Sequence, residues 1–299
     1  MNSWLIFGLI PPALWAICNL VDSKLRTKYI KDDFLLTAVA GIVGLLVFVL
    51  VPFKGMSFPG WSIALIALGT GILYIYAMVP YFKALSFEDA SSVILLWFIA
   101  QIIVPFGAKF FLNESLVVSQ YVGFGLVLIG GLLISIKRDS LKKLTVSKAL
   151  FLMLLSGVLL DVYYMLEKYV YQHESFWNGF FWIRLGSFVG ALTIILMPKY
   201  WCQFKKLAIN FKSKSWKLVF STEIINIIAL ISIGYAISIG SVSLVISLIN
   251  FQPLFILILV IILSKFFPHL YEENLDKKTL TFKIIAVILL VIGLFLVGA

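Results

Sequence analysis

Long apolar segments separated by short connections are the feature that most constrains this chain. A bilayer core of about 30 Å needs about 20 apolar residues in a helix, whereas transmembrane strands would show alternating segments of about 10 residues. The sequence therefore predicts an all-α integral membrane protein with ten transmembrane helices. We place them near residues 3–21, 33–52, 61–80, 90–111, 119–136, 148–169, 176–197, 217–239, 242–263 and 281–298.

The charges support this interpretation. Only 13% of the residues are charged and 62% are hydrophobic, whereas soluble domains carry about 25% charged residues. The net charge is +10, which in a soluble protein could indicate nucleic-acid binding. Here the basic residues lie in short connections, so we expect contact with the headgroups of the lipid bilayer and no nucleic acid.

The sequence lacks the residue patterns that several kinds of protein chemistry require. Cys18 and Cys202 lie far apart without metal-ligand spacing, and we interpret them as inert thiols. His173 and His269 are isolated in loops, so we expect no metal. The sequence contains no GxxxxGK[ST], which argues against a nucleotide-driven pump and leaves no cofactor to predict. The N-terminal segment lacks a basic region and a clear cleavage site, so we interpret it as a retained first helix.

The basic residues are distributed unevenly between the two sides. Counted together with the adjoining span ends, connections 1–2, 3–4, 5–6, 7–8 and 9–10 carry 20 Lys and Arg, and the other four carry 3. The positive-inside rule therefore places the odd connections in the cytoplasm. With ten spans, both termini of this multi-pass protein would face outward across the plasma membrane.

An internal repeat divides the chain. The segment ALSFEDASSVILLWFIAQ from Ala84 to Gln101 matches AISIGSVSLVISLINFQP from Ala236 to Pro253. Each is followed by an apolar span, a polar connection and a last span that contains glycine. Two halves of five spans start on opposite sides of the membrane, so we predict two inverted five-helix repeats at residues 1–140 and 146–299, an architecture common in transporters.

The same segments resemble a known family. The run ALWAICNLVDSKL, the ALxxxxASxxxLL pattern at Ala84 with the following NESLVVSQYVGFGLVLIGG, and YAISIGSVSLVISLINFQPLF with Pro253 are similar to EamA-type members of the drug/metabolite transporter superfamily. The resemblance covers essentially the whole chain and implies transport of a small solute, without specifying which. Gln101 stands where the first half usually has proline, connection 9–10 is longer than its partner, and the family's termini usually face the cytoplasm.

Ionisable residues inside spans are costly and tend to be functional. Asp161 and Arg184 fall at similar depth on consecutive helices, so we expect them to pair or to share a polar cavity; a fixed structural ion pair is the alternative. Glu223 and Asn226, on one helix face, could line a vestibule, with an interfacial carboxylate near Lys217 as the alternative. Asp22 and Glu167 lie near span ends, where they could simply reach the interface.

Aromatic and amide side chains complete the candidate site. Aromatic faces beside a carboxylate suit a cationic or amphipathic organic solute, although packing and interfacial anchoring explain such residues equally simply. The amides supply hydrogen-bonding groups inside spans or link helices. The predicted substrate-binding set is Trp15, Asn19, Tyr74, Trp97, Gln101, Asp161, Tyr164, Arg184, Glu223, Asn226 and Asn250.

These observations favour a secondary transporter that moves a small organic metabolite, such as an amino acid or an amine, by alternating access. Asp161 or Glu223 could couple proton movement to solute movement. A membrane enzyme acting on a lipid-linked substrate, or a non-transporting scaffold, is the alternative, although no catalytic constellation is recognisable. Import and export, and a monomer and a homodimer, all remain open.

Overall fold

The computed structural model describes residues 3–87, 97, 100–135, 148–209, 214–266 and 277–298. Its elements are almost entirely helical, and the described part of the chain contains no strand. The elements are α1 Ser3–Lys24, η1 Leu25–Tyr29, α2 Asp33–Val43, η2 Gly44–Leu50, α3 Val51–Lys54, α4 Trp61–Ala84, η3 Gln101–Ile103, α6 Val104–Leu112, α7 Val118–Ser135, α9 Lys148–His173, α10 Phe176–Ile195, α11 Pro198–Ile209, α12 Lys214–Ile239, α13 Val242–Ser247, η4 Leu248–Phe251, α14 Gln252–Phe266 and α15 Lys277–Gly298.

Seven helical segments of the described residues are long and apolar enough to cross a membrane. Three shorter apolar helices, at Gln101–Leu112, Val118–Leu133 and Ile284–Gly298, overlap the remaining predicted spans. The multi-pass helical architecture is therefore confirmed, whereas ten crossings and the inverted repeat stay predictions. Part of the predicted span 90–111 and the last residue of 119–136 lie outside the described residues. The seven segments are Ser3–Lys24, Asp33–Lys54, Trp61–Ala84, Lys148–His173, Phe176–Ile195, Trp216–Ile239 and Val242–Leu259.

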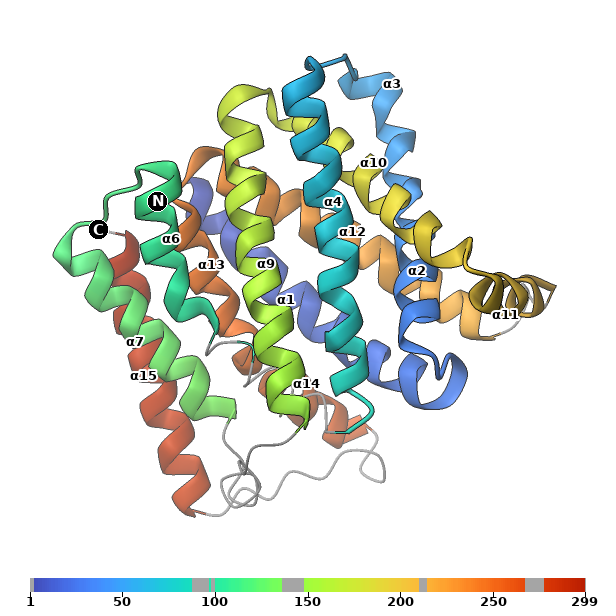
Figure 1. Cartoon of the computed structure of the whole chain (residues 1–299). Coiled ribbons are helices and arrows are strands. Elements are labelled where there is room, and N and C mark those ends of the chain that lie inside the picture. Colours follow the sequence, from blue (N-terminus) through green and yellow to red (C-terminus); the bar gives the residue numbers. More distant parts are fainter. Residues whose placement is uncertain are drawn as a thin grey trace.

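The bundle has two ends that differ in character (Figure 1). We call one the terminus end, because both chain termini and the connections at 55–60, 113–117 and 240–241 lie there. The other is the basic end, where α1 ends at Lys24, the connection at 25–32 carries Arg26, Lys28 and Lys31, and α11 lies. Lys199 on α11 pairs with Asp32, the N-cap of α2, at 3.4 Å.

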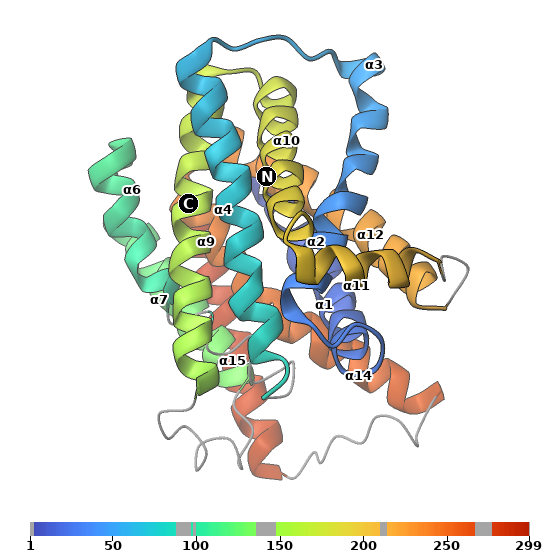
Figure 2. The same ribbon diagram turned by 45° about the vertical axis from the view of Figure 1, so that its right-hand side comes forward.

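Long helix pairs make up the bundle. The helices α4 and α9 run side by side, as do α7 and α15 (Figures 1 and 2). Equally extensive contacts join α1 to α12 and α4 to α10. Under the predicted repeat, α1–α12 and α4–α9 would be equivalent pairs, which supports the repeat without establishing it.

Glycines bring α4 and α10 into backbone contact. A Cβ added at Gly71 would lie less than 3 Å from backbone atoms of Ile183 and Ser187, and one at Gly186 equally close to Leu68. Since small residues let helices approach closely, Gly186 and Gly190, four residues apart, allow α10 to pack directly against α4.

Aromatic side chains fill the bundle toward the terminus end. Tyr171 and Phe176 lie with ring centroids 5.4 Å apart, and Phe176 meets Tyr235 at the same distance. Phe180 and Phe181 are fully buried beside them. Such contacts leave little free volume, because each ring buries a large apolar surface.

Side-chain hydrogen bonds hold the turn between α12 and α13 in place at the terminus end. Glu114 accepts hydrogen bonds from Ser241 Oγ (2.7 Å) and from the Val242 amide (2.9 Å). Lys168 Nζ donates to the carbonyl oxygens of Ile237 (2.8 Å) and Gly240 (2.7 Å). An anion therefore meets the start of one helix and a cation the end of another, the favourable arrangement for both helix dipoles.

Candidate functional site

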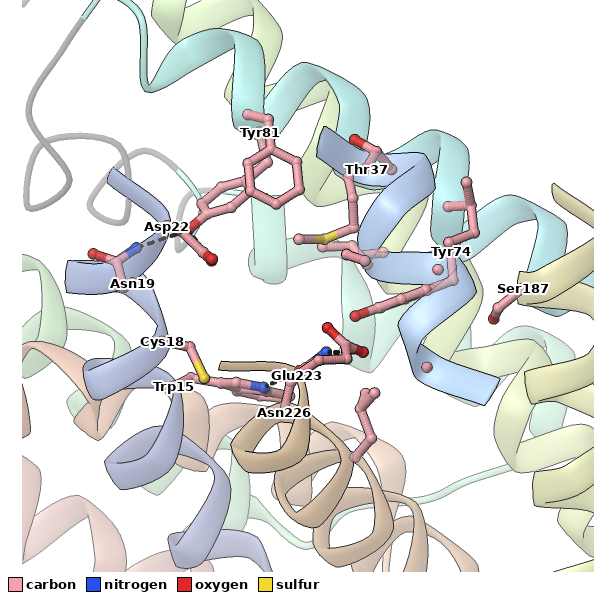
Figure 3. Close-up of a pocket in the computed structure, with 18 of the residues that line it drawn as sticks. Trp15, Cys18, Asn19, Asp22, Thr37, Tyr74, Tyr81, Ser187, Glu223 and Asn226 are labelled. Carbon is pink, nitrogen blue, oxygen red and sulfur yellow. Dashed lines mark hydrogen bonds between the residues drawn. The ribbon is translucent and has the colours of Figure 1, made fainter. Parts of the chain in front are cut away.

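A cavity of about 120 Å³ lies between α1, α2, α4, α9, α10 and α12. Polar side chains from several helices point into it (Figure 3). Its wall also includes Gln101 on η3 and Gln252 on α14. The polar and aromatic residues that line it are Trp15, Cys18, Asn19, Asp22, Thr37, Tyr74, Tyr81, Trp97, Gln101, Asp161, Tyr164, Arg184, Ser187, Thr222, Glu223, Asn226 and Gln252.

One wall is built by α1 and α12. Trp15 Nε1 donates to Asn226 Oδ1 at 3.0 Å, and Asn226 Nδ2 donates to Glu223 Oε1 at 3.2 Å. Glu223 and Asn226 share a face because they lie three residues apart in one helix. Glu223 is only 7% exposed, so the alternative of an interfacial carboxylate beside Lys217 is wrong.

A second polar group joins α1 to α4. Asn19 Nδ2 donates to the Tyr81 hydroxyl at 2.9 Å, and that hydroxyl donates to Asp22 Oδ2 at 3.4 Å. The Tyr81 ring stacks on Trp97 with centroids 5.1 Å apart. In Figure 3, Asp22 and Glu223 face each other across the open space. Asp22 is thus a cavity residue, and the expectation that it merely reaches the interface is wrong.

Arg184 enters the site from α10. Its Nη2 donates to the Tyr163 hydroxyl at 2.7 Å, and its guanidinium carbon lies 4.8 Å from the centre of the Tyr74 ring. Cation–π attraction of this kind stabilises a buried guanidinium. Its Nε is buried and has no hydrogen-bond partner among the residues that the structure describes.

Asp161 lies in the same cavity but does not bind Arg184. Its Oδ2 is buried with no hydrogen-bond partner, and no ion pair joins the two residues within the described ranges. Of the two predicted arrangements, the ion pair is wrong, and the shared cavity is what the structure shows. Glu167, expected near the interface, is instead fully buried and accepts from the Tyr171 hydroxyl at 2.8 Å.

Two interrupted helices meet beside the cavity. The 3₁₀ turn η3 precedes α6, and the 3₁₀ turn η4 precedes α14 with Pro253 at its start. Asn250 Nδ2 donates to Gln101 Oε1 at 2.7 Å between these breaks. Irregular backbone at membrane depth is tolerated where it is buried in protein or lines a cavity, and here Gln101 lines the cavity while Asn250 supports it from behind.

Ten of the eleven predicted site residues thus line one cavity, and Asn250 contacts it through Gln101. Their role in binding a substrate stays a prediction. Sequence reasoning missed Cys18, Asp22 and Tyr81. The first two could have been found, because Trp15, Cys18 and Asp22 recur every three to four residues and so share one face of α1. Nothing in the sequence indicates that Tyr81 contacts Asn19.

No group of three or more His, Cys, Asp or Glu side chains that could hold a metal ion occurs among the described residues. The cavity instead offers carboxyl, guanidinium, amide and phenol groups beside aromatic faces. This is the chemistry of reversible binding of a small organic molecule, in which a few placed polar groups orient a ligand within a largely apolar wall.

Comparison with known proteins agrees with the fold. Among the solved structures, 29 chains match; one, described only as "Crystal structure of protein", aligns with a TM-score of 0.68 at 16% identity over 99% of this chain and 97% of its own. None of the curated proteins matches the sequence. Residues 2–136 match the model of the EamA-like transporter family. The first part of the chain is therefore similar to EamA-like transporters, and the apolar helices of the described residues are those of a multi-pass membrane protein.

Proposed function

We propose that this protein is a secondary transporter that carries a small organic metabolite across the plasma membrane, with the cavity as its binding site. The observation that carries the proposal is the position of the cavity. Six long helices surround it, and they come from both predicted five-helix repeats. A site at the interface of two repeats is where inverted-repeat transporters bind their solute.

The different packing of the two ends supports alternating access. Toward the terminus end, aromatic rings and the contacts of Glu114 and Lys168 close the bundle. The cavity lies on the other side of this packing, where its wall includes Asp22 near the end of α1 and Thr37 near the start of α2. We propose that transport separates the terminus-end contacts while the basic end closes.

Carboxyl groups in the cavity support coupling to protons. In the described part of the chain, Asp161 has an oxygen without a hydrogen-bond partner, and Glu223 accepts one hydrogen bond, from Asn226 on its own helix. A proton on either carboxyl cancels a charge inside an apolar bundle, where an unpaired charge is costly. We propose that proton binding there is linked to solute binding.

Purified protein in liposomes tests the coupling. Asp161→Asn and Glu223→Gln should be compared with wild type for solute uptake driven by a pH gradient and for exchange of labelled against unlabelled solute without a gradient. Loss of gradient-driven uptake with exchange retained in either variant supports the proposal. Unchanged gradient-driven uptake in both variants would contradict the proposed proton coupling. Absence of exchange by the wild-type protein across a broad metabolite panel would contradict the proposed transport.

The predicted orientation can be tested with the native cysteines. Cys202 is exposed on α11 at the basic end, whereas Cys18 is buried. A membrane-impermeant thiol reagent should therefore leave Cys202 unlabelled in intact cells and label it once the membrane is opened. Labelling of intact cells, lost in Cys202→Ser, would instead place the basic end outside.

A further inference from the structure

The cavity is electrically polarised. Its acidic side is formed by Asp22 of α1 and Glu223 of α12, whose side chains face the same open space (Figure 3). Its basic side is formed by Arg184 of α10. Asp22, Glu223 and Arg184 all line this one cavity. A ligand in the cavity is therefore in contact with both signs of charge.

The basic side is incompletely paired. Arg184 is 6% exposed, yet within the described residues it makes one hydrogen bond, to the neutral hydroxyl of Tyr163. Its Nε–H is buried without an acceptor. The nearby Glu167 binds Tyr171 instead and is not part of the cavity wall. Arginine offers a planar fork of donors that matches a carboxylate, so the free donors of Arg184 point to a carboxylate on the ligand.

The acidic side lacks a cation. Arg184 is the one basic residue in the described cavity wall, and neither Asp22 nor Glu223 forms an ion pair within the described ranges. Around them stand the rings of Trp15, Tyr74 and Tyr81. Carboxylates combined with aromatic faces attract an ammonium group, so this side suits a positively charged end of the ligand.

We infer that the transported solute is a small zwitterion, with its carboxylate on Arg184 and its ammonium group between Asp22 and Glu223. This inference rests on the proposed function and specifies its substrate class. A purely cationic solute would leave Arg184 unpaired, and a purely anionic solute would face Asp22, Asp161 and Glu223. A solute with both charges pairs each side, which matters because unpaired buried charge is strongly unfavourable.

A matched ligand series tests the inference. The thermal stability of the purified protein is measured with a panel of small α-amino acids, with their amides, which keep only the positive charge, and with their N-acetyl derivatives, which keep only the negative charge. A ligand that binds the folded state adds RT ln(1 + [L]/Kd) to its stability. We expect at least one amino acid to bind and both of its single-charge derivatives to bind at least about tenfold more weakly.

Substitutions in the cavity wall test which side chain binds each charged end of the ligand. Arg184→Gln should weaken binding of the amino acid about 100-fold or more and leave the amide nearly unaffected, whereas Asp22→Asn should weaken both. Arg184→Lys, which keeps the charge and loses the planar fork, should show an intermediate loss and serves if Arg184→Gln does not fold. Lys199→Met, an exposed charge at the basic end, is the control and should bind like wild type.

Two results would overturn the inference: an amide or N-acetyl derivative that binds as tightly as its parent amino acid, or a panel in which no amino acid binds. Exchange of some other solute by the wild-type protein in liposomes would, in either case, leave the proposed function standing. The two proposals can therefore fail separately.

Discussion

Glu114 and Glu223 show how the two ends of the molecule differ. At the terminus end, both carboxylate oxygens of Glu114 accept hydrogen bonds, from Ser241 and Val242. In the cavity, Glu223 accepts one hydrogen bond, from Asn226 on its own helix. The first carboxylate joins segments 127 residues or more apart in the chain, whereas the second has no hydrogen bond beyond its own helix among the described residues.

This difference separates stabilising polar groups from functional ones. At the terminus end, Glu114 and Lys168 find partners within the protein and hold helices together. Polar atoms around the cavity, such as Asp161 Oδ2 and Arg184 Nε, lack partners within the described structure. Since buried polar groups are normally paired, unpaired ones beside a cavity indicate that a ligand or a proton completes them.

The largest expected effect on stability comes from a substitution where α4 crosses α10. Gly71→Leu forces a side chain into the backbone of Ile183 and Ser187, which cannot move aside as a flexible side chain would. We expect the free energy of unfolding to fall by about 3 kcal/mol or more, measured as loss of folded protein in detergent.

Gly69 provides the matched control for that crossing. It lies two residues away on the same helix, and a Cβ there has no atom within 4 Å. Gly69→Leu should therefore purify and unfold like wild type. Equal damage from both substitutions would show that α4 tolerates no bulk at all, and that the contact with α10 is not what matters.

The two glutamates give the next largest effect and test the comparison directly. Glu114→Gln keeps the shape but loses two charge-assisted hydrogen bonds, so we expect a loss of about 1–3 kcal/mol in unfolding free energy with the binding site intact. Glu223→Gln should cost less than about 1 kcal/mol, because it weakens a single hydrogen bond, and should impair gradient-driven transport. Denaturation midpoints and liposome uptake separate the two; the reverse pattern would contradict the comparison.

Trp15 tests whether the cavity wall itself holds α1 to α12. Trp15→Phe removes the hydrogen bond to Asn226 while keeping an aromatic ring. We expect a loss of about 1 kcal/mol in unfolding free energy, measured by thermal denaturation in detergent. Asn226→Ala in the same background should then add less than it does alone, because the shared bond is already lost. Fully additive losses would mean that the bond contributes nothing.

The sequence predicted well how deep in the bundle a side chain lies, and poorly which way it faces. A rise of about 1.5 Å per residue placed Asp161 and Arg184 at similar depth, and both line the cavity. It could not show that Arg184 binds Tyr163, because the rotation of one helix against its neighbour depends on packing. Glu167 was misplaced for the same reason: near a span end, a side chain reaches water or the bundle core depending on the side it faces.

Asp22 shows where more could have been predicted. Its position near the end of the first apolar run suggested the interface, yet its spacing from Trp15 and Cys18 puts it on the helix face that meets α12. The helical spacing of these residues predicts the shared face, whereas the length of the apolar run suggests the interface. The contact of Asn19 with Tyr81 joins residues far apart in sequence, and no local pattern could have predicted it.

The smallest effect is expected at the exposed surface of the basic end. Hydrogen bonding to Tyr200 and the nearby charge of Asp32 raise the pKa of Lys199 above 10.5, so any contribution of this pair is fully present at neutral pH and is lost only as the pH rises through that raised pKa. Because exposed ion pairs stabilise proteins little, Lys199→Met should leave the thermal midpoint at pH 7 unchanged. Asp32→Ala should lower it, because Asp32 also caps α2 through the amides of Phe34 and Leu35, and losing such a cap costs about 1 kcal/mol. Equal effects of the two substitutions would mean that α11, and not the cap, holds this end of α2 in place.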